Sequence, residues 1–183
     1  MKVGAGFLGH LSRRVDSQQL VAAAQLCERA GFDSFWVADQ RFMRDAFISL
    51  AMIAAHTERL QLGTRVTDPY IRHPALTAIA AATLDEASNG RAILGMGAGG
   101  SGFSQLGLSR DRPALALREA IHLIRMLWSG AEVEYQGTSV QWGKGEIEFP
   151  VRANIPIVIA ARGPKLLELA GEVADGVIVA TGV

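Results

Sequence analysis

The chain has 183 residues, 49% of them hydrophobic, and its 18 lysine and arginine residues balance its 18 aspartate and glutamate residues. This composition can form a sizeable core and excludes a disordered chain, and the neutral charge argues against a nucleic-acid-binding protein, which normally carries a basic excess. With a single cysteine and no uncharged apolar run of the roughly 18 to 20 residues that span a bilayer, we expect a cytoplasmic protein that touches no membrane.

The first half of the chain alternates strand patterns with helix patterns. KVGAGFLG, residues 2–9, is a short apolar run of strand length. Asp16 and Gln19 have the spacing of a capping box, and apolar residues then recur at helical spacing up to Gly31. Further strands are predicted for 32–39, 59–66 and 91–97, and helices for 46–56 and 74–88.

The second half continues this alternation after a long glycine-rich loop. Helices are predicted for 113–130 and 164–174, and buried strands for 155–161 and 175–180. Residues 131–152 differ, because their polar and apolar residues alternate and turn near Gly137. This pattern indicates a small hairpin inserted into the repeat.

Alternating apolar strands and helices predict an α/β fold with a parallel sheet. Two architectures remain open, a doubly wound open sheet and part of a closed TIM barrel of eight strand–helix units. The tight alternation and the polar or glycine-rich loops after the strands favour the TIM barrel. A closed barrel typically needs about 250 residues. We therefore interpret 1–183 as a single barrel domain that is truncated at its C-terminal side, with about six strands and an insertion at about 131–152.

Four consecutive strands end in polar or small residues. Asp39 and Gln40 follow the second strand, a polar run from Thr67 follows the third, glycines follow the fourth, and Arg162 and Gly163 follow the fifth. Each residue alone could be a solvated loop residue or a helix cap. Because ligands in α/β folds bind beyond the carboxyl ends of the strands, their coincidence predicts a shared pocket.

The glycine-rich run GMGAGG, residues 95–100, matches the pattern G-x-G-x-x-G of dinucleotide-binding folds. The next helix begins only near Pro113, so a nicotinamide site is disfavoured. The glycines still allow backbone N–H groups to approach a phosphate or a flat ring. Arg162 and the amides around Gly163 offer a second phosphate site at a helix N-terminus. No His, Cys, Asp or Glu cluster has metal-ligand spacing, so we expect no metal.

Four blocks of the sequence resemble consecutive blocks of the luciferase-like monooxygenase family: GFDSFWVADQ, LGTRVTDPYIRHPA, ATLDEASNGRAILGMGAGG and AARGPKLLELAGEVADGVI. The resemblance extends over essentially the whole chain. It is closest to the branch that contains methylenetetrahydromethanopterin reductase and other deazaflavin-dependent reductases. It implies a TIM barrel with an insertion that binds coenzyme F-420, or alternatively FMN, at the carboxyl ends of the strands. It also implies a homodimer.

The resemblance further assigns roles to individual residues. It implies a non-proline cis peptide bond between Arg65 and Val66, in a bulge that backs the cofactor ring. The residues implied to touch the ring region or to lie near it are Thr64, Arg65, Val66, Thr67 and Asp68. Those implied to line the cofactor elsewhere are Gly97, Ala98 and Gly99, with Ala161, Arg162 and Gly163 at its phosphate.

Asp39 and Gln40 are the candidate catalytic residues. Asp39 stands where the family often places an acid near the polar edge of the ring, and Gln40 stands where many relatives have histidine. A glutamine can donate and accept hydrogen bonds, but it cannot shuttle a proton near neutral pH.

Three functions follow as alternatives. The first is an oxidoreductase that transfers hydride between coenzyme F-420 and a small organic substrate. The second is an FMN-dependent monooxygenase that uses molecular oxygen. The third is a truncated barrel without catalytic activity that serves as a binding or assembly module.

Several other residues invite a functional interpretation. We expect His73 to be a structural residue at a helix start, whereas His10 could face the substrate. Arg118, Glu119 and Arg125 are interpreted as a solvated helix face.

Overall fold

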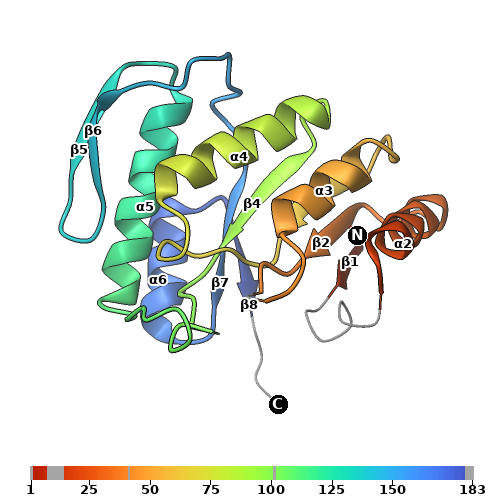
Figure 1. Ribbon diagram of the computed structural model, residues 1–183, viewed down its shortest axis with the longest axis horizontal. Coiled ribbons are helices and arrows are strands. Elements are labelled where there is room, and N and C mark those ends of the chain that lie inside the picture. The colour runs from red at the N-terminus through yellow and green to blue at the C-terminus, as the bar shows by residue number, and fades with distance from the viewer. Residues whose placement is uncertain (1, 8–14, 41, 101, 180–183) are drawn as a thin grey trace.

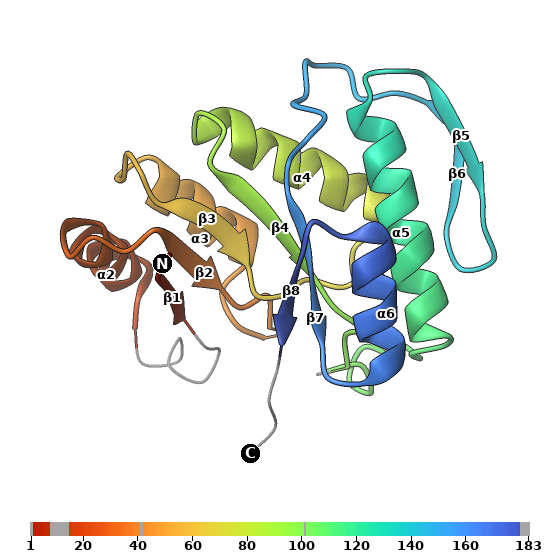
Figure 2. The ribbon, with the colours of Figure 1, turned by 180° about the vertical axis from the view of Figure 1, so that it is seen from behind.

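The computed structural model describes residues 2–7, 15–40, 42–100 and 102–179 (Figure 1). Its centre is a parallel sheet of six strands in the order β1-β2-β3-β4-β7-β8. These strands are β1 Gly4–Phe7, β2 Ser34–Val37, β3 Gln61–Thr64, β4 Ala92–Met96, β7 Ile157–Ala161 and β8 Gly176–Val179. The spatial order follows the chain order, as in a barrel, whereas the order reverses in a doubly wound sheet. The sheet curls into part of a TIM barrel, which confirms the predicted fold class (Figures 1 and 2).

Helices connect the strands and pack side by side along one face of the sheet (Figure 2). They are α2 Ser17–Arg29, α3 Ala46–Ala54, α4 Pro74–Ala87, α5 Pro113–Trp128 and α6 Pro164–Val173. The predicted capping box of Asp16 and Gln19 is present at α2, and the Asp45 carboxylate accepts the Ile48 N–H at the start of α3. Side-chain oxygens thereby satisfy N–H groups that have no partner within the helix.

The core lies between the sheet and these helices. Alternate strand residues such as Phe35 and Leu62 point to the helices and are fully buried. Trp128 of α5 is also fully buried, and its indole N–H donates to the Ala78 carbonyl over 3.1 Å.

The opposite, concave face of the sheet is built around Trp36. Its ring lies over Gly63 of β3 and Gly4 of β1, on strands that pair with β2 on either side. A Cβ at Gly63 would overlap the indole ring, and a Cβ at Gly4 would lie 3.1 Å from its Nε1. The two glycines therefore provide the space that the large side chain between them requires.

Between α5 and β7 the chain forms the predicted hairpin, with strands β5 Val133–Gln136 and β6 Gln141–Gly145. Glu119 fixes this hairpin to α5. Its carboxylate accepts the backbone N–H groups of three turn residues over 2.9, 2.7 and 3.0 Å: Thr138, Ser139 and Val140.

The prediction that Glu119 lies on a solvated face was wrong, because Glu119 is only 7% exposed. Its neighbours Arg118 and Arg125 do lie towards the surface and pair with Glu172 and Asp175 of the next strand–helix unit. Burial raises the pKa of the Glu119 carboxyl, but the three N–H donors outweigh burial and bring the pKa below its ordinary value.

We predict that Gly63→Ala lowers the free energy of unfolding by about 1–3 kcal/mol, because the new methyl group overlaps the Trp36 ring. Urea unfolding followed by circular dichroism measures this change. In a Trp36→Ala background the same substitution should cost much less, since the ring is gone. An equal cost in both backgrounds would contradict the proposed overlap.

Glu119→Gln should lower the free energy of unfolding at pH 7 by about 1–3 kcal/mol, because an amide replaces the charged acceptor of three N–H groups. The folded-state pKa is depressed, so the stabilisation is present above the unfolded pKa of about 4.3 and is lost as the pH falls through the folded value. The difference in the free energy of unfolding between wild type and variant, a gap of charge origin, should therefore disappear below about pH 4. Glu134→Gln on the exposed side of the hairpin is the matched control; a gap that persists at low pH would rule out the charge as its cause.

Candidate functional site

The loop after β3 is bonded to both neighbouring strands. The Arg65 N–H donates to the Val37 carbonyl of β2 over 2.7 Å, and the Thr67 N–H donates to the Gly95 carbonyl of β4 over 2.9 Å. Between these two contacts, the peptide bond from Arg65 to Val66 is cis, as the family resemblance implied. The backbone thus forms a bulge at the carboxyl end of β3.

Thr64 fixes the start of this bulge. Its hydroxyl donates to the Gly95 carbonyl over 2.8 Å and accepts the Gly95 N–H over 2.9 Å, so one side chain satisfies both backbone groups of that glycine. The residues of Thr64 and Thr67 are 1% and 2% exposed. Both threonines are therefore buried beneath the rim and support its backbone.

The Val66 side chain lies against glycines of β4. A Cβ at Gly97 would come within 2.6 Å of Val66 Cγ2, and a Cβ at Gly95 within 3.2 Å of Cγ1. The same Gly97 position would lie 3.7 Å from Ala160 Cβ of β7. The ends of three strands therefore meet at an apolar cluster, here called the Val66 bed, which consists of the partly exposed Val66 and Ala160 and the buried Gly95 and Gly97.

Asp68 organises the loop that continues from the bulge. Its carboxylate accepts the N–H groups of Tyr70 and Ile71 over 2.9 and 3.2 Å. Gly99 approaches it closely, since a Cβ there would lie 3.0 Å from the carboxyl carbon and 2.6 Å from Phe103. Gly99 also has φ +65°, which favours glycine. Asp68 therefore shapes the backbone of the site rather than presenting a free carboxylate.

Two aromatic residues join this loop to the long loop after β4. The rings of Tyr70 and Phe103 meet edge to face with centroids 5.5 Å apart. The Tyr70 hydroxyl donates to the Asp111 carbonyl over 2.9 Å, and burial raises the pKa of this phenol. The Arg110 guanidinium donates to the Gly99 carbonyl over 3.2 Å. Residue patterns did not indicate these contacts, because the aromatic residue in each loop belongs to no periodic pattern.

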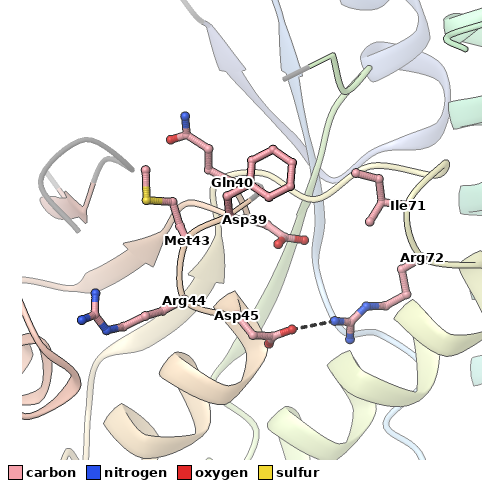
Figure 3. A pocket seen from close by; sticks show the side chains of 8 residues that line it. Asp39, Gln40, Met43, Arg44, Asp45, Ile71 and Arg72 are labelled. Carbon is pink, nitrogen blue, oxygen red and sulfur yellow. Dashed lines mark hydrogen bonds and ion pairs between the residues drawn. The ribbon is translucent and has the colours of Figure 1, made fainter. Parts of the chain in front are cut away.

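Asp39 and Gln40 lie beyond β2, in a pocket of about 170 Å³ (Figure 3). The other lining residues are Phe42, Met43, Arg44, Asp45, Ile71 and Arg72. Arg72 pairs with Asp45 over 2.8 Å and lies over the Phe47 ring, 4.9 Å from its centroid. Typical cofactor pockets measure about 300–1,000 Å³, so this pocket can hold only one end of a large ligand.

The third predicted cluster lies beyond β7. Ala161 is the last residue of that strand and is fully buried, whereas Arg162 is exposed. Gly163 precedes α6, whose first turn has no side-chain cap. Because β7 pairs with β4, this cluster shares the carboxyl-end rim with Gly97 and Ala98.

His73 is confirmed as a structural residue. Its Nδ1 accepts the Ala75 N–H at the start of α4 over 3.2 Å, which leaves the proton on Nε2 to donate to the Gln141 carbonyl of the hairpin over 2.8 Å. His10 lies outside the described residues. Within the part of the chain that the structure describes, no three His, Cys, Asp or Glu side chains gather as metal ligands would. Across the same ranges, no helix combines the length and apolar character that crossing a membrane requires.

Residues 1–183 match the family model described as luciferase-like monooxygenase. The chain belongs to this family. It is 41% identical over 157 residues to 5,10-methylenetetrahydromethanopterin reductase of Methanolobus tindarius, a match that covers 85% of this chain and 48% of that protein. The chain thus spans about half the length of the curated relatives that it matches.

Solved structures of the family share this fold. The coenzyme F-420-dependent tetrahydromethanopterin reductase from Methanopyrus kandleri superposes with a TM-score of 0.88 at 31% identity, over 96% of this chain and 55% of that one. A coenzyme F-420-dependent secondary alcohol dehydrogenase, solved with an F-420–acetone adduct, gives 0.84 at 25% identity over 97% of this chain and 58% of that one.

We predict that Tyr70→Phe speeds hydrogen exchange of amides in residues 102–112, because the bond from the phenol to the Asp111 carbonyl is lost while the ring contact with Phe103 remains. Tyr70→Ala, which also removes the ring, should speed exchange further. The free energy of unfolding should fall by about 1 kcal/mol in the first variant. Unchanged exchange in both variants would show that the two loops are held together by other contacts.

Proposed function

We propose that this chain is the cofactor-binding part of an oxidoreductase that transfers hydride between coenzyme F-420 and a small organic substrate. The observation that carries the proposal is the Val66 bed, where buried glycines let Val66 pack closely against β4 and leave the partly exposed Val66 and Ala160 side chains as an apolar support for a planar ring. The similarity to the M. tindarius and M. kandleri reductases supports a reductase, and the dehydrogenase solved with an F-420–acetone adduct supports coenzyme F-420.

The residues of the bulge and of the glycine loop would hold the ring. The backbone of Thr64 to Thr67 and of Gly97 to Gly99 borders the bed, and the Gly97 N–H joins the two segments by donating to the Thr67 carbonyl over 2.8 Å. The backbone amides around Gly163, at the start of α6, would bind the cofactor phosphate, with Arg162 beside them. When bound, the cofactor supplies the hydride or accepts it.

Asp39 and Gln40 would act at the polar edge of the ligand. Both line the pocket beyond β2, so the pocket would receive one end of the ligand while the bed supports its flat part. Gln40 would orient a polar group through hydrogen bonds without moving a proton. The protein's contribution is then binding, orientation and exclusion of water from the reacting atoms.

We further propose that these residues form part of a single barrel domain. Strands β1 and β8 are the outer strands of the six-stranded sheet, and Val177 and Val179 of β8 are 45% and 60% exposed. Additional strand–helix units paired with these edges would cover the exposed valines and enclose the concave face.

Titration of the purified protein with coenzyme F-420 and with FMN, followed by absorbance and fluorescence, tests the function. We expect saturable binding of coenzyme F-420. Gly97→Ala should weaken this binding about tenfold, because the methyl group would displace Val66 from the bed.

Gly143→Ala is the matched control, since a Cβ at this hairpin glycine meets no atom within 4 Å. It should leave cofactor binding unchanged, and circular dichroism should show that both variants are folded. Tight binding of FMN alone would favour the monooxygenase. Failure to bind either cofactor would contradict the oxidoreductase proposal and favour the binding or assembly module.

A further inference from the structure

The Arg65 side chain crosses the concave face of the sheet. Gly63 faces the Trp36 ring on the concave side of the sheet. Arg65 follows two residues later, so its side chain leaves the backbone on that same side. Its guanidinium reaches Gly6 of β1: a Cβ at Gly6 would overlap Nη1 and would lie 3.6 Å from Cζ and 3.7 Å from Cδ. The side chain therefore spans from β3 across β2 to β1 at the mouth of the concave face.

The Arg65 guanidinium carries a charge that the described residues do not neutralise. The residue is exposed, and over 2–7, 15–40, 42–100 and 102–179 no ion pair or side-chain hydrogen bond engages it. Other arginines differ: Arg72, Arg125 and Arg152 each pair with an aspartate over 2.7 to 2.9 Å. A guanidinium has five N–H donors in a fork that matches a carboxylate or a phosphate.

The surroundings of Arg65 suit an organic anion better than a hydrated ion. Gly6 pairs with Trp36, so an indole ring lies on the strand between the two ends of the arginine side chain. The ring is only partly buried, and its N–H already donates to the Ser34 hydroxyl over 2.9 Å. The mouth thus combines one cation with an apolar wall, an arrangement that binds a molecule with a charged end and an apolar body.

We propose that Arg65 binds a carboxylate or phosphate group of the organic substrate and thereby restricts the substrates to anions. This inference rests on the proposed function, because the Arg65 backbone adjoins Val66 while its guanidinium lies over β1 at the same carboxyl-end rim of the sheet. The Arg65 side chain is then a specificity-determining group for the substrate, while the Arg65 backbone keeps the place beside the cofactor that the family resemblance implied.

The anion site is tested by NMR of the arginine side-chain Nε–H signals, with the Arg65 signal assigned by its loss in Arg65→Gln. Titration with acetate and with inorganic phosphate should shift this signal saturably. Neutral acetamide, which has the shape of acetate, should not shift it. Arg29→Gln, which removes the same charge from the exposed end of α2, should leave the anion affinity unchanged. Arg65→Gln should weaken the anion affinity reported by the neighbouring Trp36 indole Nε–H signal at least about tenfold.

An Arg65 signal that responds equally to acetamide, or linearly without saturation, would overturn the proposal. Coenzyme F-420 titrations of wild type and Arg65→Gln then separate two sources of the anion. Equal cofactor affinity supports a substrate group as the partner. A cofactor affinity reduced about tenfold by Arg65→Gln, with phosphate and cofactor competing, would assign Arg65 to the cofactor and overturn the proposal. Wild type that binds no cofactor would contradict the proposed function itself, while the anion response at Arg65 would still be measured.

Discussion

The candidate site depends on the contact between the Thr64 side chain and the backbone of Gly95. Parallel strands normally continue their ladder of N–H and C=O bonds until both strands end. Here the Thr64 hydroxyl bonds to both the N–H and the carbonyl of Gly95. Strand β3 can therefore leave the sheet one residue later without leaving either of these buried groups unpaired. Arg65 can then bond back to β2 while Thr67 rejoins β4. The placement of the Val66 bed and of the Arg65 guanidinium both follow from this departure.

Carboxylates that accept backbone N–H groups fix the turns elsewhere in the fold. Glu28 accepts three successive N–H groups, those of residues 58–60, and its pKa is lowered by these bonds in spite of burial. Asp33 and Asp175 each accept the N–H at the start of the preceding strand, from Val3 and Ile157. A carboxylate that accepts backbone N–H groups thus occurs in both the first and the last strand–helix unit. It holds the amino ends of the strands, which leaves the carboxyl ends for ligand binding.

Local patterns predicted much of this fold. The capping box at Asp16, the turn at Gly31 and the hairpin near Gly137 all depend on residues close together in the chain, and all are present. The strands are shorter than predicted, because apolar runs continue into loops that still pack against the core. The Arg65–Val66 cis bond followed from family resemblance, and no residue pattern alone would have indicated it.

Contacts between residues far apart in sequence were the ones that residue patterns missed. Glu119 has the helical spacing of an exposed charge, and its burial depends on a turn 19 to 21 residues further along the chain. Tyr70 and Asp111 are 41 residues apart. The predicted site residues Thr64 and Asp68 do lie at the rim, yet their polar atoms hold the backbone, a role that only the three-dimensional arrangement reveals.

The approach of Arg65 to Gly6 also has an evolutionary consequence. A side chain at position 6 would occupy the place of the guanidinium, so the flexible Arg65 side chain would have to move. The residue at position 6 should therefore influence where a relative with arginine at position 65 holds that charge. Glycine at position 6 allows the guanidinium to lie over the first strand, whereas a larger residue would turn it away from β1.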